Sequence, residues 1–150
     1  MQPTVSAPWA YTLQLPHDPR APGVARATLR AILATHDLPE LTATAELLAS
    51  EMLTNAHLHT DGPYALRLRS SAPQRVRVAV WDSNPRIPPG FGDGEPGTVM
   101  QPPGTPGTAV NGRGLHLVRA CSDAWGAYLL GEAPTSHGGK LLWAECAQHE

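Results

Sequence analysis

A proline- and glycine-rich segment between residues 87 and 110 does most to constrain how this chain can fold. It holds six prolines and six glycines in twenty-four residues, a composition that cannot form a packed core. A loop of that length inside a compact domain is either functional or disordered. Only forty residues follow it, too few for a second domain of ordinary size. We therefore expect one domain that carries a long loop.

Hydrophobic periodicity predicts eight helices and strands around this segment. Apolar residues spaced three and four apart indicate helices, and apolar residues that alternate with polar ones indicate strands. In chain order these are a strand over 9–15, helices over 21–36 and 39–60, strands over 64–69 and 75–81, a short helix over 115–120, and strands over 125–130 and 140–146. Residues 1–8 are expected to form a flexible N-terminal tail, and residues 9–150 a single domain.

The two central predicted strands each have one apolar face and one polar face. In the second of them, Val76, Val78 and Val80 alternate with arginine or alanine. Such alternation indicates that helices cover only one side of the sheet. The order of elements therefore predicts an α/β (α+β) fold, a two-layer sandwich with a mixed, mostly antiparallel sheet and helices on one face.

Composition argues against several classes of function. Lys and Arg total 11 against 13 for Asp and Glu, a net charge of −2, whereas non-specific nucleic-acid binding and attachment to anionic membranes need a basic surface. No apolar run reaches membrane-spanning length, and the first residues lack the features of a signal peptide. The two cysteines, Cys121 and Cys146, match no metal-binding spacing. We expect a cytoplasmic protein with no direct nucleic-acid or membrane partner.

Glu51 and Asn55 lie four residues apart on the helix predicted over 39–60, so their side chains project together. They border the apolar stripe that contains Leu48 and Met52, a position at the rim of a pocket. A carboxamide oxygen suits Mg²⁺, and a carboxylate one turn earlier can accept a proton from a nucleophile that attacks a phosphate. Glu and Asn also share helix faces for purely structural reasons, so the pair alone leaves both interpretations open.

Asp82 follows the strand predicted over 75–81, at a strand end where functional groups are often presented. A buried carboxylate there could accept a hydrogen bond from an exocyclic amine such as that of adenine. The alternative is an aspartate that opens a turn through its own side-chain hydrogen bond.

Two glycine-containing segments lie farther along the chain. Asn111-Gly112-Arg113-Gly114-Leu115 leads from the long loop into the short helix, where glycines allow close backbone approach and free N–H groups can bind phosphate. His137-Gly138-Gly139-Lys140 precedes the last strand. By itself it predicts a glycine turn followed by a solvated lysine.

Four of these segments, in this order, resemble the GHKL superfamily of histidine-kinase-like ATPases. They most closely resemble the stand-alone anti-sigma-factor serine/threonine kinases of actinobacteria. Segment 86–111 lies where those proteins have an ATP lid, and the resemblance extends over residues 9–144. The resembling segments are Glu51-Met52-Leu53-Thr54-Asn55-Ala56 with His59 (the N box), Asp82-Ser83-Asn84-Pro85 with Pro88 (a variant first glycine box), residues 112–118 (the second glycine box) and residues 138–143 (the third).

The resemblance implies a histidine-kinase-like ATP-binding fold, with ATP and Mg²⁺ as ligands. It implies that Asn55 holds Mg²⁺, that Glu51 is the general base that activates a partner's serine hydroxyl, and that Asp82 binds the adenine amino group. The other cofactor-binding positions that it implies, near the phosphates, are Gly112, Arg113, Gly114 and Leu115.

The sequence departs from the superfamily pattern at two places. Ser83-Asn84-Pro85 stands where glycines are common in the first glycine box. Lys140 stands where many relatives have a threonine near adenine.

The resemblance leads to one expected function and two alternatives. We expect an ATP-dependent protein serine/threonine kinase that phosphorylates an antagonist protein in transcription regulation. Its partners would be a sigma factor, an anti-sigma antagonist or both, and a homodimer is possible. The first alternative is an ATP-binding interaction module that sequesters such a partner without turnover. The second is a hydrolase that does not use ATP, or a structural α/β protein, in which the four segments are coincidental.

Overall fold

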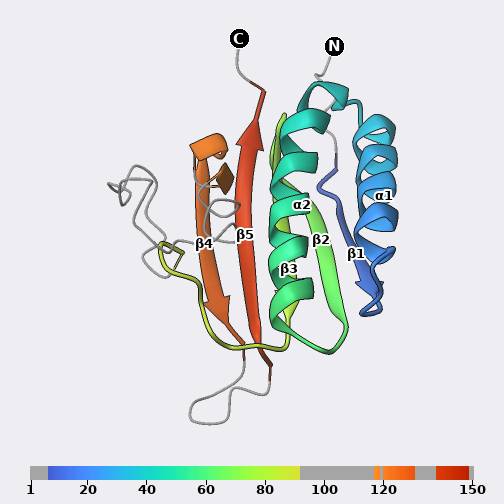
Figure 1. Cartoon of the computed structure of the whole chain (residues 1–150). Helices are drawn as coiled ribbons and strands as arrows, with labels where there is room; N and C mark the ends of the chain where they lie inside the picture. The colour runs from blue at the N-terminus through green and yellow to red at the C-terminus, as the bar shows by residue number, and fades with distance from the viewer. Residues whose placement is uncertain (1–6, 92–116, 119, 131–137, 149–150) are drawn as a thin grey trace, which may run out of the picture.

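The computed structural model describes residues 7–91, 117–118, 120–130 and 138–148. The long helices pack against the sheet (Figure 1). The elements, in chain order, are β1 (Ala10–Leu15), α1 (Ala21–Thr35), a 3₁₀ turn η1 (Pro39–Leu41), α2 (Thr42–His59), β2 (Tyr64–Ala72), β3 (Arg75–Asp82), β4 (Ala124–Leu129) and β5 (Lys140–Ala147).

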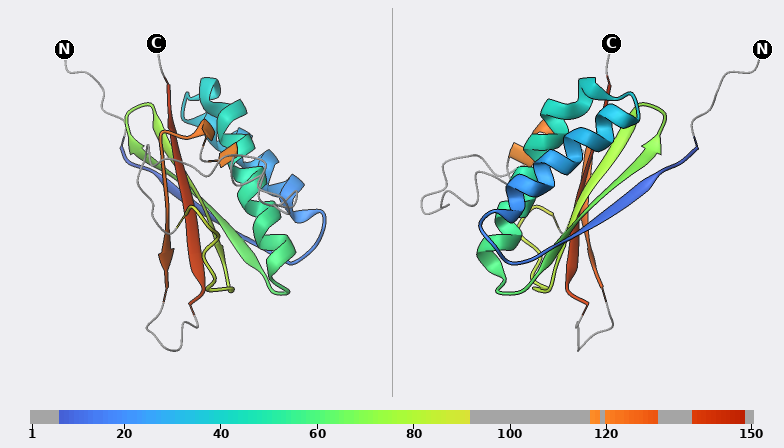
Figure 2. Two further views of the ribbon diagram at one scale, coloured as in Figure 1. Left: turned by 60° about the vertical axis from the view of Figure 1, so that its left-hand side comes forward. Right: turned by 90° about the vertical axis from the view of Figure 1, so that its right-hand side faces the viewer.

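The five strands form one sheet in the order β1-β2-β3-β5-β4, and every neighbouring pair is antiparallel. Both helices lie on the same face (Figure 2), so the α+β two-layer prediction is confirmed. The expected mixed sheet is wrong, because no described pair is parallel. The chain crosses to the far edge as β4 and returns as β5 between β4 and β3, which keeps β5 antiparallel to both neighbours.

The core lies between the two helices and the sheet. Leu48, Met52 and Ala56 of α2 are completely buried, which confirms the predicted apolar stripe. They belong to one buried cluster with alternate residues of the strands, such as Val78 and Leu142. The other face of the sheet has no described helix over it and carries exposed arginines.

The turn between β2 and β3 is tighter than predicted. The strands extend to Ala72 and Arg75, which are paired across the hairpin. Only Pro73 and Gln74 remain between them, and Gln74 has a positive φ of 59°. Proline followed by a residue of positive φ is the pattern of a type II turn.

The first residues of the long proline- and glycine-rich segment are anchored to the domain. Phe91 is completely buried in the core, and Trp125 Nε1 donates a hydrogen bond of 3.2 Å to the carbonyl oxygen of Gly90. The segment was not expected to form a core by itself, and its first residues instead add Phe91 to the core of the domain. Residues 92–111 of the predicted lid lie outside the described residues.

The short helix predicted over 115–120 is only partly covered by the structure. Residues 117–118 and 120–121 are helical, and Val118 is buried. Among the helices that the structure describes, none has the length and apolar character needed to cross a bilayer.

Candidate functional site

The end of α2, the end of β3 and the start of β5 meet at one end of the sheet, the lower end in Figure 1. Asn84, two residues after β3, links all three. Its Nδ2 donates to the carbonyl oxygen of His59 at 3.1 Å, and its backbone N donates to Asp82 Oδ1 at 2.8 Å. Its own carbonyl oxygen accepts from Lys140 Nζ at 3.0 Å. These bonds hold the loop after β3 against the last residue of α2.

Asp82 and Lys140 form a buried ion pair. The distance from Lys140 Nζ to Asp82 Oδ1 is 2.9 Å, and each side chain is only 1% exposed. The two residues are direct partners in the β3–β5 register, on the face of the sheet that carries Val80 and Leu142. The expected solvated lysine is therefore wrong, since the register places Lys140 opposite the only carboxylate of β3 and beneath the helix layer.

Gly139 fixes the close approach of these two strands. Its φ is +75°, and a Cβ added there would lie 2.0 Å from the carbonyl oxygen of Asp82. Only glycine adopts that conformation without strain and leaves room for the neighbouring backbone. The glycine turn predicted before the last strand thus has a specific purpose: it brings the backbone before Lys140 onto the end of β3.

Both interpretations of Asp82 concern the same carboxylate. The hydrogen bond from the Asn84 backbone N confirms that Asp82 closes a turn through its own side chain. The bond uses Oδ1, the oxygen that also receives Lys140. No hydrogen bond from a described residue reaches Oδ2. The turn therefore leaves Oδ2 without a donor from the described residues, and a ligand amine could donate to it. Adenine binding by Asp82 stays a prediction.

Glu51 and Asn55 lie one turn apart on α2, the helix whose last residue contacts the cluster of Asp82, Asn84 and Lys140. Asn55 is buried, with 8% of its surface exposed, and Glu51 is half-buried. At a rise of 1.5 Å per residue they lie roughly 12 Å and 6 Å along the helix before His59, whose carbonyl Asn84 holds. No described residue makes a hydrogen bond to the Asn55 carboxamide or an ion pair with Glu51. A buried amide of this kind can serve as a ligand.

The residues present fit a magnesium nucleotide. Among the described residues there is no group of three or more His, Cys, Asp or Glu side chains that could hold a metal ion by themselves. Mg²⁺ bound to a nucleotide does not need one, because it keeps several waters and takes one or two protein ligands together with phosphate oxygens. Asn55 could supply that single oxygen. The predicted phosphate contacts Gly112, Arg113, Gly114 and Leu115 lie outside the described residues.

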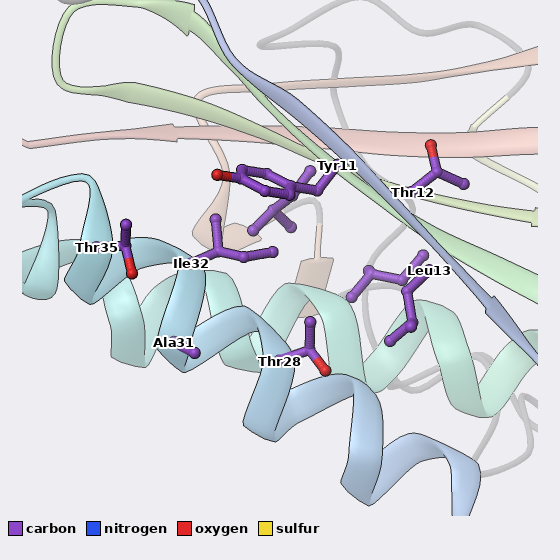
Figure 3. Close-up of a pocket in the computed structure, with 9 residues that line it drawn as sticks. Tyr11, Thr12, Leu13, Thr28, Ala31, Ile32 and Thr35 are labelled. Atoms are coloured by element: carbon purple, nitrogen blue, oxygen red, sulfur yellow. The ribbon is translucent and has the colours of Figure 1, made fainter.

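Two cavities lined entirely by described residues lie elsewhere. One, of about 300 Å³, lies between β1 and α1; Figure 3 shows Tyr11 and Leu13 of β1 facing Ile32 of α1 across it. The other, of about 280 Å³, is on the open face of the sheet, where Arg67 is one of its lining residues. Neither is lined by Glu51, Asn55 or Asp82, so the candidate site is distinct from both.

Sequence comparison decides the family. The chain matches the histidine kinase-like ATPase domain over residues 15–139. It belongs to that family. The match covers most of the chain, including the Glu51–Asn55 helix and the Asp82 loop, and it is a match to an ATP-binding domain. No curated protein matches the sequence significantly.

Sequence reasoning missed two members of the cluster. Asn84 was predicted only as part of a variant glycine box, although an aspartate that bonds the backbone N two residues on would have placed residue 84 beside Asp82. Lys140 was expected in solvent. A signal for its burial was present in the strand that it opens, because Lys140, Leu142 and Ala144 share one face and the latter two are apolar.

Proposed function

We propose that this protein is an ATP-dependent serine/threonine protein kinase of the anti-sigma-factor type, which phosphorylates a protein antagonist. The observation that carries the proposal is the position of Asn55 and Glu51 on α2. Asn55 is buried without a hydrogen-bond partner among the described residues, and Glu51 is half-buried one turn earlier. In a chain of the histidine kinase-like ATPase family, that is an arrangement suited to a metal-bound nucleotide beside a proton acceptor.

The nucleotide would lie between α2 and the loop after β3. Asn55 would offer its carboxamide oxygen to Mg²⁺, and Asp82 would accept a hydrogen bond from the adenine amino group. Backbone N–H groups at Gly112 and Gly114 would receive the phosphates, as N–H groups at a helix start generally do. Mg²⁺ would neutralise charge on the phosphate oxygens.

Glu51 would act on the partner protein. As a serine hydroxyl of the partner approaches the γ-phosphorus, Glu51 would accept its proton. A bond forms between the serine oxygen and the γ-phosphorus, the bond from that phosphorus to the β–γ bridging oxygen breaks, and ADP leaves. Since positioning and charge neutralisation supply most of the catalysis in phosphoryl transfer, the contribution of Glu51 is the proton transfer.

The partner is proposed from the resemblance of the four sequence segments to anti-sigma kinases. It would be an antagonist protein, a sigma factor or both, and a homodimer is part of the same proposal. Light scattering of the purified chain, alone and with a bound antagonist, measures each of these assemblies.

Phosphate transfer from γ-labelled ATP to candidate antagonists tests the kinase activity. We expect Glu51→Gln to lower the transfer rate on the order of a hundredfold or more, the contribution of a general base, with ATP binding retained. Asn55→Ala should abolish the rise in melting temperature that ATP and Mg²⁺ produce. The matched control is Glu46→Gln, on the same helix, whose carboxylate pairs with Arg30 and should not affect transfer.

The outcomes separate the kinase from an interaction module. Undiminished transfer in Glu51→Gln would exclude Glu51 as the base. A melting temperature that rises with ATP, together with no transfer to any antagonist that binds, would favour the module. Absence of nucleotide binding in the presence of Mg²⁺ would contradict both.

A further inference from the structure

Lys140 is the single lysine of a chain that has ten arginines, and it is one of the most deeply buried side chains. It is 1% exposed, as is its partner Asp82. Burying an ammonium ion costs free energy unless the charge is paired and its donors are satisfied. None of the arginines among the described residues is buried, whereas Lys140 is.

The geometry around Lys140 explains the need for an ammonium group. Its Nζ donates to Asp82 Oδ1 at 2.9 Å and to the carbonyl oxygen of Asn84 at 3.0 Å, which are two of the three bonds that an ammonium can donate. A compact ammonium group can reach both acceptors at the end of β3. The planar guanidinium of arginine is larger and is best matched by a fork-shaped partner.

The same contacts make the two carboxylate oxygens of Asp82 unequal. Oδ1 accepts hydrogen bonds from Lys140 and from the backbone N of Asn84. Oδ2 accepts none from the described residues. A carboxylate held by two donors on one oxygen cannot rotate freely about its Cβ–Cγ bond, so the direction in which Oδ2 can accept a hydrogen bond is fixed.

We propose that Lys140 is a positioning residue for base recognition, which pins Oδ1 of Asp82 and so presents Oδ2 to the exocyclic amine of adenine. This inference rests on the proposed ATP binding and goes beyond it, because it assigns the selection of an amino-purine to a pair of residues. In this chain a direct ion pair from Lys140 orients the Asp82 carboxylate.

A purely structural ion pair makes a different prediction. If Lys140 only stabilised the fold, its replacement would weaken the binding of every nucleotide equally. If it orients Asp82, replacement should selectively reduce the advantage of a base that carries an amino group. The comparison of ATP with purine riboside triphosphate isolates this effect, because the two share sugar and phosphates and the latter lacks the 6-amino group.

The experiment is titration calorimetry of the full chain with each nucleotide and Mg²⁺. The wild-type chain should bind ATP about tenfold or more tightly than purine riboside triphosphate, as expected for a hydrogen bond to a charged acceptor. In Lys140→Met the preference should fall below about threefold, while the affinity for purine riboside triphosphate changes little. Circular dichroism verifies folding, and Arg77→Met serves as the control that removes a cation paired on the open face.

Two further measurements keep the proposal testable if Lys140→Met does not fold. The first uses the single lysine: ¹⁵N-lysine labelling of the wild-type chain gives one side-chain ammonium resonance, which should shift with ATP and much less with purine riboside triphosphate. The second uses the double variant Asp82→Asn/Lys140→Met, which removes both charges and should bind the two nucleotides with equal affinity.

The negative outcomes distinguish failure of the inference from failure of the proposed function. A folded Lys140→Met that keeps the full preference for ATP overturns the inference and leaves the proposed function intact. So does a lysine resonance that responds equally to both nucleotides. A wild-type chain that binds neither nucleotide overturns the proposed function and the inference together.

Discussion

Two ion-pair clusters connect β3 to β5, and they lie on opposite faces of the same pair of strands. Asp82 and Lys140 face the helices, and both side chains are 1% exposed. On the open face, Glu145 accepts from Arg75 at 2.8 Å and from Arg77 at 2.7 Å, and these arginines are 32% and 20% exposed. The distances are nearly equal, so geometry alone does not distinguish the two clusters.

The difference lies in what surrounds the charges. On the open face, arginine is suited to its position: Arg77 stacks on Trp143, with its guanidinium carbon 3.8 Å from the ring centroid, and can still reach water. The Glu145 side chain is only 9% exposed, but its two arginines can turn to water when it is lost, so the cluster contributes less to stability than a fully buried pair. In the buried cluster both side chains are only 1% exposed, so each charge depends on the other. The two clusters therefore differ in exposure: the open-face cluster has two partly exposed cations, and the helix-facing pair is fully buried.

The largest predicted effect is on the buried cluster. Lys140→Met should lower the free energy of unfolding by about 3–5 kcal/mol, because it leaves the Asp82 carboxylate buried without its counter-charge. The double variant Asp82→Asn/Lys140→Met should recover most of that loss. Urea denaturation measures both. A loss below about 1 kcal/mol for the single variant, the range of a surface pair, would remove the distinction between the two clusters.

Substitution of the glycine beside the buried pair should destabilise the fold more than substitution of the glycine on the open face. Gly139→Ala should cost about 2–4 kcal/mol, because φ is positive and the new Cβ would meet the backbone of Asp82. Gly126→Ala, on the open face, places its Cβ 2.7 Å from the ring of Trp143, a side chain that can shift, so we expect about 1–2 kcal/mol. Thermal unfolding of both variants measures the two losses of stability, and equal losses would contradict the tight backbone contact between Gly139 and Asp82.

A smaller effect is expected from the open-face cluster. Glu145→Gln should lower the free energy of unfolding by about 1 kcal/mol, since both arginines can turn to solvent. A double-mutant cycle with Arg77→Met isolates the pairwise contribution. That contribution should shrink as salt is raised from low to about 1 M, because partly exposed charges are screened. An interaction that is insensitive to salt would indicate that this cluster, too, is desolvated.

The smallest effect is the pH dependence of the same carboxylate. Burial raises the pKa of Glu145, but the hydrogen bonds and positive charges of Arg75 and Arg77 together outweigh it and lower the pKa below its ordinary value of 4.5. A carboxyl whose pKa is lower in the folded state stabilises the fold above the unfolded-state pKa and loses that contribution as pH falls through the folded-state pKa.

Unfolding of the wild-type chain and of Glu145→Gln should therefore differ by a constant amount above pH 4.5. The two stabilities should converge as the solution is made more acidic. Urea denaturation at a series of pH values measures the difference. A difference that stays constant down to the most acidic pH at which the chain folds would show that Glu145 is not stabilised by its charge.

Much of the fold followed from local pattern. The stripe of Leu48 and Met52 predicted the buried face of α2, and the alternation of Val76, Val78 and Val80 predicted a sheet covered on one side, because both patterns repeat with the geometry of their element. Phe91 was not predicted in the core, because a single aromatic residue among prolines and glycines has no period from which burial can be inferred.

The residues of the candidate site also fall into those that local pattern predicted and those that it did not. Glu51 and Asn55 were recognised together because they are four residues apart on one helix. The pairing of Asp82 with Lys140 was not, because fifty-eight positions separate them and no local rule relates their orientations.

The sequence by itself determined the helix with Glu51 and Asn55, the strand that ends at Asp82, the glycines before the last strand, and through them the family. Only the tertiary structure decided that Lys140 is buried on Asp82 and that Asn84 connects this pair to the end of α2. The physical reason is the strand register. Pairing β5 beside β3 sets which residues face each other, and the helix layer above them determines whether an ion pair lies in water or in the core.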